Sequence, residues 1–150
     1  MAEIYNNCYL NRNTTYGNYG NINLGVYNFG GGFGYTNQYI HFKTNLTLNT
    51  SIMTRVEAIG YAYGSALPIK CCWVSYTYSY LISGQVSIAN GLTAHGAYMS
   101  TDGYVVYRAF CSNDYYINFV LNSMHVNPTG AGYPLSITAV NKNTNSGNYY

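Results

Sequence analysis

Alternating apolar and polar positions predict strands along most of the chain. In residues 39–46, Ile40 and Phe42 fall on one face while His41 and Lys43 fall on the other. This period of two is typical of a half-buried strand.

Residues 52–63 fit two patterns. Ile52, Val56 and Ile59 have helical spacing, but the whole segment also alternates as a strand. Its β-branched content and the glycine at residue 60 favour the strand.

Residues 69–80 are strongly β-forming in composition, with Tyr76, Tyr78 and Tyr80 on one face. Because this run is longer than most strands, we expect a bend or bulge within it.

Shorter β-forming runs follow at regular spacing, and turn residues separate them. These runs are residues 85–89, 97–100, 104–111, 115–126 and 134–140. Asn90-Gly91 and Asp102-Gly103 are hairpin signals, because a type I′ turn needs positive φ at both central positions. The pattern predicts an all-β, antiparallel β-sandwich of the jelly-roll kind over residues 39–140.

Residues 1–38 differ in composition, since Asn, Tyr and Gly dominate them. Such a segment cannot bury enough surface to fold alone, so we expect an extended arm packed on the rest of this chain or on copies of it. The arm's candidate assembly residues are aromatic: Tyr5, Tyr9, Tyr16, Tyr19, Tyr27, Phe29 and Phe33. Residues 141–150 form a polar tail that is expected to fray or to lie on a neighbour.

Composition limits the classes of protein that remain. The 150 residues are enough for one domain, and only 7% are charged, against about 25% in a typical globular chain. The 48% hydrophobic and 17% aromatic content excludes disorder over the whole length. A net charge of +2 from scattered single residues provides no basic field, so we expect no nucleic-acid partner.

The N-terminus resembles no signal peptide, and no apolar run is long enough to span a membrane. We therefore expect a protein made in the cytoplasm, with no membrane insertion. The adjacent Cys71 and Cys72 would point to opposite faces of a strand, so free buried thiols are expected for the four cysteines.

Candidate catalytic and metal-binding groups are few. Asp102 and Asp114 stand in turn sequences, where Asp bonds to its own backbone, and Glu57 can pair with Arg55. The three histidines, His41, His95 and His125, have no metal-ligand spacing, although a trimer could bring three copies of one of them together on its axis. These residues predict no enzyme, no metal and no cofactor.

Exposed tyrosine and asparagine can serve two functions. Both residue types hydrogen-bond sugar hydroxyls, and Tyr rings offer stacking platforms, but the same residues make protein interfaces. The composition does not separate the two, and its low charge favours an obligate oligomer. The candidate glycan or receptor residues are Tyr61, Tyr63, His95, Tyr98 and Asn127.

About two-thirds of the chain resembles a domain found at the ends of bacteriophage tail fibres and related virion appendages. The resemblance rests on the order of several short stretches after a Gly-rich lead. These stretches are residues 39–45, 60–64, 68–69, 76–78, 100–106, 115–120 and 134–138.

The resemblance implies a non-enzymatic, homotrimeric β-sandwich on a virion. Its implied partners are other copies of itself, other virion structural proteins and a host-surface glycan. The resemblance implies a tail-fibre tip, a tail-attached subunit or a capsid decoration protein. Such domains normally end a long fibre, and here about 38 residues precede the domain. We therefore expect either a short free-standing virion protein, such as a capsid decoration or tail-attached subunit, or an N-terminal arm that docks on another structural protein. A lectin-like module is the alternative, and a polysaccharide hydrolase is a more distant one.

Overall fold

A computed structural model describes residues 8–13, 19–31, 37–48, 51–63, 66–88, 91–112, 116–127 and 135–150. These residues form ten strands. The strands are β1 (Cys8–Asn13), β2 (Tyr19–Gly31), β3 (Gln38–Thr47), β4 (Ile52–Ala62), β5 (Leu67–Tyr78), β6 (Tyr80–Ile88), β7 (Leu92–Met99), β8 (Tyr104–Cys111), β9 (Ile117–Asn127) and β10 (Ile137–Asn143).

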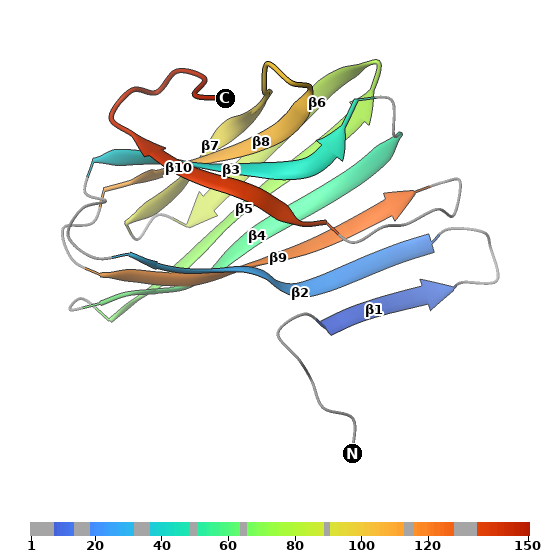
Figure 1. Cartoon of the computed structure of the whole chain (residues 1–150). Coiled ribbons are helices and arrows are strands. Elements are labelled where there is room, and N and C mark those ends of the chain that lie inside the picture. Colours follow the sequence, from blue (N-terminus) through green and yellow to red (C-terminus); the bar gives the residue numbers. More distant parts are fainter. Residues whose placement is uncertain are drawn as a thin grey trace.

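Two antiparallel sheets pack face to face, as the sequence predicts (Figure 1). The larger sheet has the order β1-β2-β9-β4-β5-β6, and the smaller has the order β10-β3-β8-β7. The β-sandwich is therefore confirmed.

Strand β4 shows why residues 52–63 form a strand. Val56 and Ala58 are fully buried between the sheets, whereas Met53 and Ile59 are exposed on the opposite face. An amphipathic helix would have its apolar residues along one stripe, whereas this segment has apolar residues on both faces of an extended strand.

The bend expected within residues 69–80 lies at Ser79, directly after strand β5, which itself has no bulge. The registers of β5 with β4 and β6 show no shift, and the chain reverses at Ser79, whose φ is 58°. The long β-forming run is thus one strand, a tight turn and the start of the next strand.

The two glycine turn signals have different outcomes. Gly103, with φ 86°, closes the predicted hairpin between β7 and β8. Gly91, with φ 87°, lies where the chain passes from β6 in the large sheet to β7 in the small one. The hairpin prediction at Asn90-Gly91 is therefore wrong.

Part of the predicted arm belongs to the sandwich. Strand β2 pairs with β9, and the Phe29 ring is buried and stacks on Phe119 at a centroid distance of 4.7 Å. The arm was expected to pack either on the rest of this chain or on copies of it. Residues 19–31 pack on the rest of this chain. Assigning Phe29 to assembly is wrong, since its ring belongs to the core.

The other candidate residues of the arm have different positions. Tyr27 is half-buried against Phe42, with ring centroids 6.1 Å apart. Tyr9 lies in β1 and Tyr19 in β2. The remaining three candidates, Tyr5, Tyr16 and Phe33, lie outside the described residues.

Aromatic rings and thiols fill the core. The buried Trp73 indole donates a hydrogen bond from Nε1 to the Arg108 carbonyl oxygen at 2.9 Å, and Tyr107 Oη lies 2.6 Å from Ser75 Oγ. Cys71, Cys72 and Cys111 are buried thiols, which confirms that prediction for these three cysteines.

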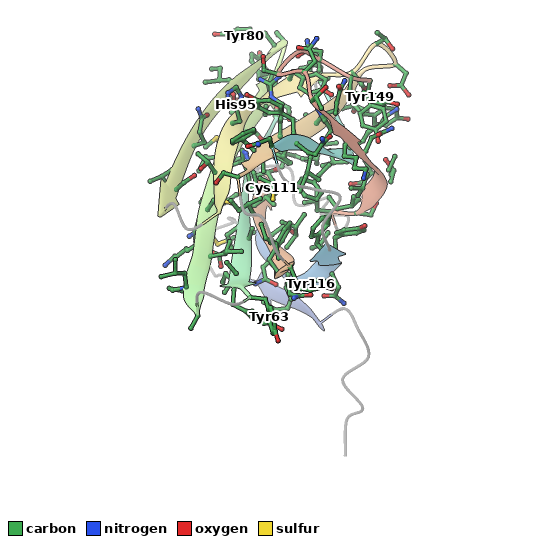
Figure 2. All side chains as sticks on the ribbon, turned by 90° about the vertical axis from the view of Figure 1, so that its left-hand side faces the viewer. Tyr63, Tyr80, His95, Cys111, Tyr116 and Tyr149 are labelled. Carbon is green, nitrogen blue, oxygen red and sulfur yellow. The ribbon has the colours of Figure 1, made fainter. Side chains whose placement is uncertain are left out.

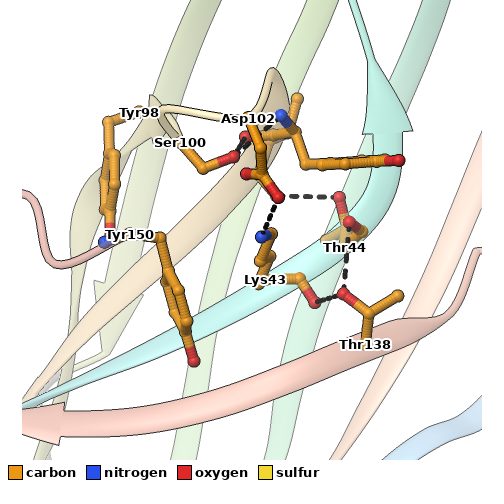
Figure 3. Close-up of polar contacts among 9 residues, drawn as sticks. Lys43, Thr44, Tyr98, Ser100, Asp102, Thr138 and Tyr150 are labelled. Atoms are coloured by element: carbon orange, nitrogen blue, oxygen red, sulfur yellow. Dashed lines mark hydrogen bonds and ion pairs between the residues drawn. The ribbon is translucent and has the colours of Figure 1, made fainter.

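The C-terminal residues fold back over the outer face of the small sheet instead of fraying (Figures 1 and 3). The Tyr149 and Tyr150 amides both donate to Tyr98 Oη, at 3.0 and 3.3 Å. Lys43 Nζ lies 2.6 Å from an Asp102 carboxylate oxygen and 5.3 Å from the Tyr150 ring centroid. The tail thus covers its own chain, and residues 141–143 are part of β10.

His41 is fully buried beneath this tail. Its Nδ1 lies 2.9 Å from Tyr98 Oη, which already accepts two amide hydrogens, so the Tyr98 hydroxyl donates to a neutral imidazole. Burial, and secondarily the charge of Arg108, lowers the pKa of His41 from its ordinary 6.5 to about 4.

Gly60 allows β4 and β9 to approach closely, which generates a first prediction. A Cβ at this position would lie 1.9 Å from the Asn118 carbonyl oxygen and 2.5 Å from Phe119 Cα. We expect Gly60→Ala to lower the free energy of unfolding by about 2–4 kcal/mol in urea titrations followed by Trp73 fluorescence.

Gly84→Ala is the matched control, because its Cβ would meet nothing within 4 Å. Its free energy of unfolding should stay level or rise slightly, since glycine weakens strand interiors. Equal losses for the two variants would contradict the close approach at Gly60.

His41 generates a second prediction, on pH. Its folded pKa lies below its unfolded value, so the unfolded chain binds more protons between pH 6.5 and about 4. Its contribution to stability is complete above pH 6.5 and is lost as the pH falls toward 4, by at most about 3 kcal/mol. Urea titrations at a series of pH values measure this loss, and His41→Phe should flatten the profile over this range. A profile unchanged by His41→Phe would show that other groups cause the loss.

Candidate functional site

A groove opens on the outer face of the large sheet, near the end where β4 stops and β9 begins. It has a volume of about 350 Å³, and its lining comes from β2, β4 and β9. Tyr61 points outward from β4, is 52% exposed and stands opposite Asn118 of β9 in the ladder. A large aromatic ring therefore borders an open hollow on the surface.

Two further tyrosines lie close to the same end of the sheet. The Tyr63 amide donates to the Tyr116 carbonyl oxygen at 2.8 Å, which extends the pairing of β4 with β9 by one step. Their rings meet edge to face with centroids 5.7 Å apart, and both are exposed. Figure 2 shows this pair at one end of the molecule and Tyr80 at the opposite end.

Amides supply the polar groups of the groove. Asn28 of β2 and Asn118 of β9 line it, and the residues that line it carry no charged side chain. A Cβ at Gly30 would stand 3.1 Å from Asn118 Oδ1, so glycine leaves room for this amide. Amides both donate and accept hydrogen bonds, so the groove suits an uncharged ligand rich in hydroxyl groups.

The centre of the same sheet face holds one ion pair. Arg55 reaches Glu57 Oε2 at 2.7 Å and Cys72 Sγ at 3.2 Å. The bond to the Cys72 sulfur is the first cause that raises the pKa of Arg55. The pairing of Arg55 with Glu57 expected from the sequence is present.

The candidate glycan residues predicted from the sequence do not form one site. Tyr61 and Tyr63 lie beside the groove, but His95 is exposed on β7 of the other sheet, with its ring edge-on to Tyr39 at 5.0 Å. Tyr98 is only 7% exposed beneath the C-terminal tail, so its place among exposed loop residues is wrong. Asn127 ends β9, and its side chain lies outside the described part of the structure.

Sequence reasoning missed Tyr116, Asn118 and Asn28. The alternation within residues 115–126 could have placed Asn118 on the outward face of its strand. The proximity of all three to Tyr61 depends on β9 lying between β2 and β4, an order that no local pattern reveals.

The remaining titratable groups are separated. Among the described residues, the carboxylates are Glu57 on the large sheet and Asp102 in the turn between β7 and β8. The hydrogen bond from Lys43 holds the pKa of Asp102 below its usual value. The described part of the chain contains no cluster of three metal-ligating side chains and no helix that could span a membrane.

Comparisons with known proteins give one likeness, and it is structural. No protein-family model matches the chain, and no curated protein matches it in sequence. The fold is similar to part of tailspike protein gp49 from the Acinetobacter baumannii bacteriophage Fri1, described as a capsular polysaccharide depolymerase. The TM-score is 0.56 at 8% sequence identity, over 90% of this chain and 22% of that one.

This likeness concerns the fold, and the chain spans less than a quarter of the tailspike's length. It corrects one prediction. The expectation that the protein is not an enzyme is overturned, because a solved protein that contains this fold is described as a depolymerase.

Proposed function

We propose that this chain is a host-contact module of a bacteriophage tail appendage, and that it binds a surface saccharide in the groove beside Tyr61. The observation that carries the proposal is the arrangement of three exposed tyrosines at a largely apolar groove that also presents the amides of Asn28 and Asn118. The fold it shares with part of a phage tailspike supports the virion setting.

The chemistry of the groove fits a sugar. A tyrosine ring presents an apolar face to the C–H groups of a pyranose, and its hydroxyl remains available to water or to the ligand. Asn28 and Asn118 can bond ring hydroxyls without a charged partner. The saccharide class that these residues favour is therefore neutral.

The virion partners are also part of the proposal. A tail appendage joins other virion structural proteins, and the homotrimer expected from the sequence would present several grooves to one polysaccharide. Several weak sites on one particle give tight attachment through multivalency. Because the similar tailspike is described as a polysaccharide depolymerase, polysaccharide hydrolysis is a second candidate activity of the same module.

Loss of the ring platform generates a third prediction. The double variant Tyr61→Ala, Tyr116→Ala should bind a neutral oligosaccharide at least about tenfold more weakly, a change of about 1.4 kcal/mol. A glycan array identifies the sugar, and isothermal titration calorimetry measures the affinity. Reducing ends counted in the same incubations report any cleavage.

Tyr80→Ala is the matched control, because Tyr80 is 63% exposed at the opposite end of the molecule. Its affinity should equal that of the unmodified chain. Absence of saturable binding to any glycan, or an equal loss in the Tyr80 variant, would contradict the proposed site.

A further inference from the structure

The outer face of the large sheet carries an unusual number of exposed apolar side chains. They are each between 39% and 65% exposed and come from β2, β9, β4, β5 and β6: Leu24, Met124, Met53, Ile59, Val74, Ile82 and Val86. We call these seven residues the apolar face. A sheet face in contact with water normally carries polar residues at these positions, so a strand that is apolar on both faces is typical of a sheet covered on both sides.

These side chains lie in neighbouring rows across the strands, with Tyr76 and Arg55 between some of them. Across the strands, Met53 stands opposite Tyr76, which stands opposite Ile82. In the next row Met124, Arg55 and Val74 are neighbours in the same way. Three hollows of about 160, 300 and 130 Å³ lie among these rows, so the face is contoured and can interdigitate with a partner.

The size of the apolar face suits a stable association. Its seven side chains are each 39–65% exposed and come from five adjacent strands. This many exposed apolar side chains on one sheet face exceeds the scattered single ones that are normal on a monomer. A biological interface buries at least roughly 1,000 Å² over both partners, which about 500 Å² on each copy would supply.

The charges on this face favour a second copy as the partner. Arg55 and Glu57 neutralise each other within the face, so two identical faces can meet without bringing an unpaired central charge into contact with its like. Lys70 is exposed on the same face, beside Ile59 in the ladder. The centre of the apolar face therefore has no net charge that would attract a strongly acidic or basic partner.

We propose that the apolar face is an interface between copies of this chain. The proposal goes beyond saccharide binding, because it assigns a surface that holds the module together in its assembled form. Ile59 belongs to the apolar face and also lines the groove. The saccharide test changes Tyr61 and Tyr116, which the apolar face does not include, and the assembly test changes Val74, which does not line the groove, so the two failures are distinguishable.

The experiment measures the mass of the full chain by size-exclusion chromatography with light scattering over a dilution series. We expect the unmodified chain to have an even multiple of its 16.7 kDa mass, because two identical faces that meet pair the copies two by two. Val74→Lys places a charge beside Arg55 and should reduce the mass to that of one chain. The matched control Thr138→Lys lies on an exposed position of β10 in the other sheet and should keep the multiple.

Two readouts separate dissociation from misfolding. The single tryptophan, Trp73, is buried, so unchanged emission shows that the Val74 variant remains folded. In the unmodified chain, peroxide oxidation of Met53 and Met124 should slow as concentration rises, because the interface would cover them. A single-chain mass at every concentration, a folded Val74 variant that keeps the multiple, or oxidation independent of concentration would overturn the proposal.

Discussion

The contact of the two sheets through Phe42 is the interaction on which the rest of the structure depends. From the centre of the small sheet, this ring meets Phe29, Trp73 and Phe119 of the large sheet edge to face, at centroid distances of 6.0 to 6.4 Å. Three strands far apart in the sequence, β2, β5 and β9, are thereby fixed against one residue of β3. The position of β2 against β9, and so the groove between them, follows from this packing.

With the inner faces filled, the outer faces of the two sheets have different environments. The small sheet is covered by its own C-terminal residues, which hydrogen-bond to Tyr98 and enclose His41. The large sheet has no such cover among the described residues, although seven of its outward side chains are exposed and apolar. In a chain with 7% charged residues, this uncovered surface is the one that we propose for contacts with a partner and a ligand of little charge.

The sequence predicted what depends on local alternation. Residues 104–111 were expected as a strand and form β8 with the same bounds, and the period of two in residues 39–46 correctly placed Phe42 inward. What depends on distant contacts could not be predicted. Tyr98 has the same local pattern whether exposed or covered by residues 149 and 150, and the position of Phe29 depends on a strand nearly a hundred residues later. Only part of the candidate site was predicted, for the same reason. Tyr61 and Tyr63 are close to each other in the sequence, whereas Tyr116 and Asn118 come from a distant part of the chain.

We therefore propose that this sandwich is a module with one face for its own copies and one end for the host. The most direct test is a cryo-electron microscopy structure of the assembled full chain with a bound oligosaccharide. We predict that the large sheets pack against one another with Arg55 and Glu57 enclosed, and that sugar density lies against Tyr61. Large-sheet faces open to solvent, with sugar elsewhere on the molecule, would contradict it.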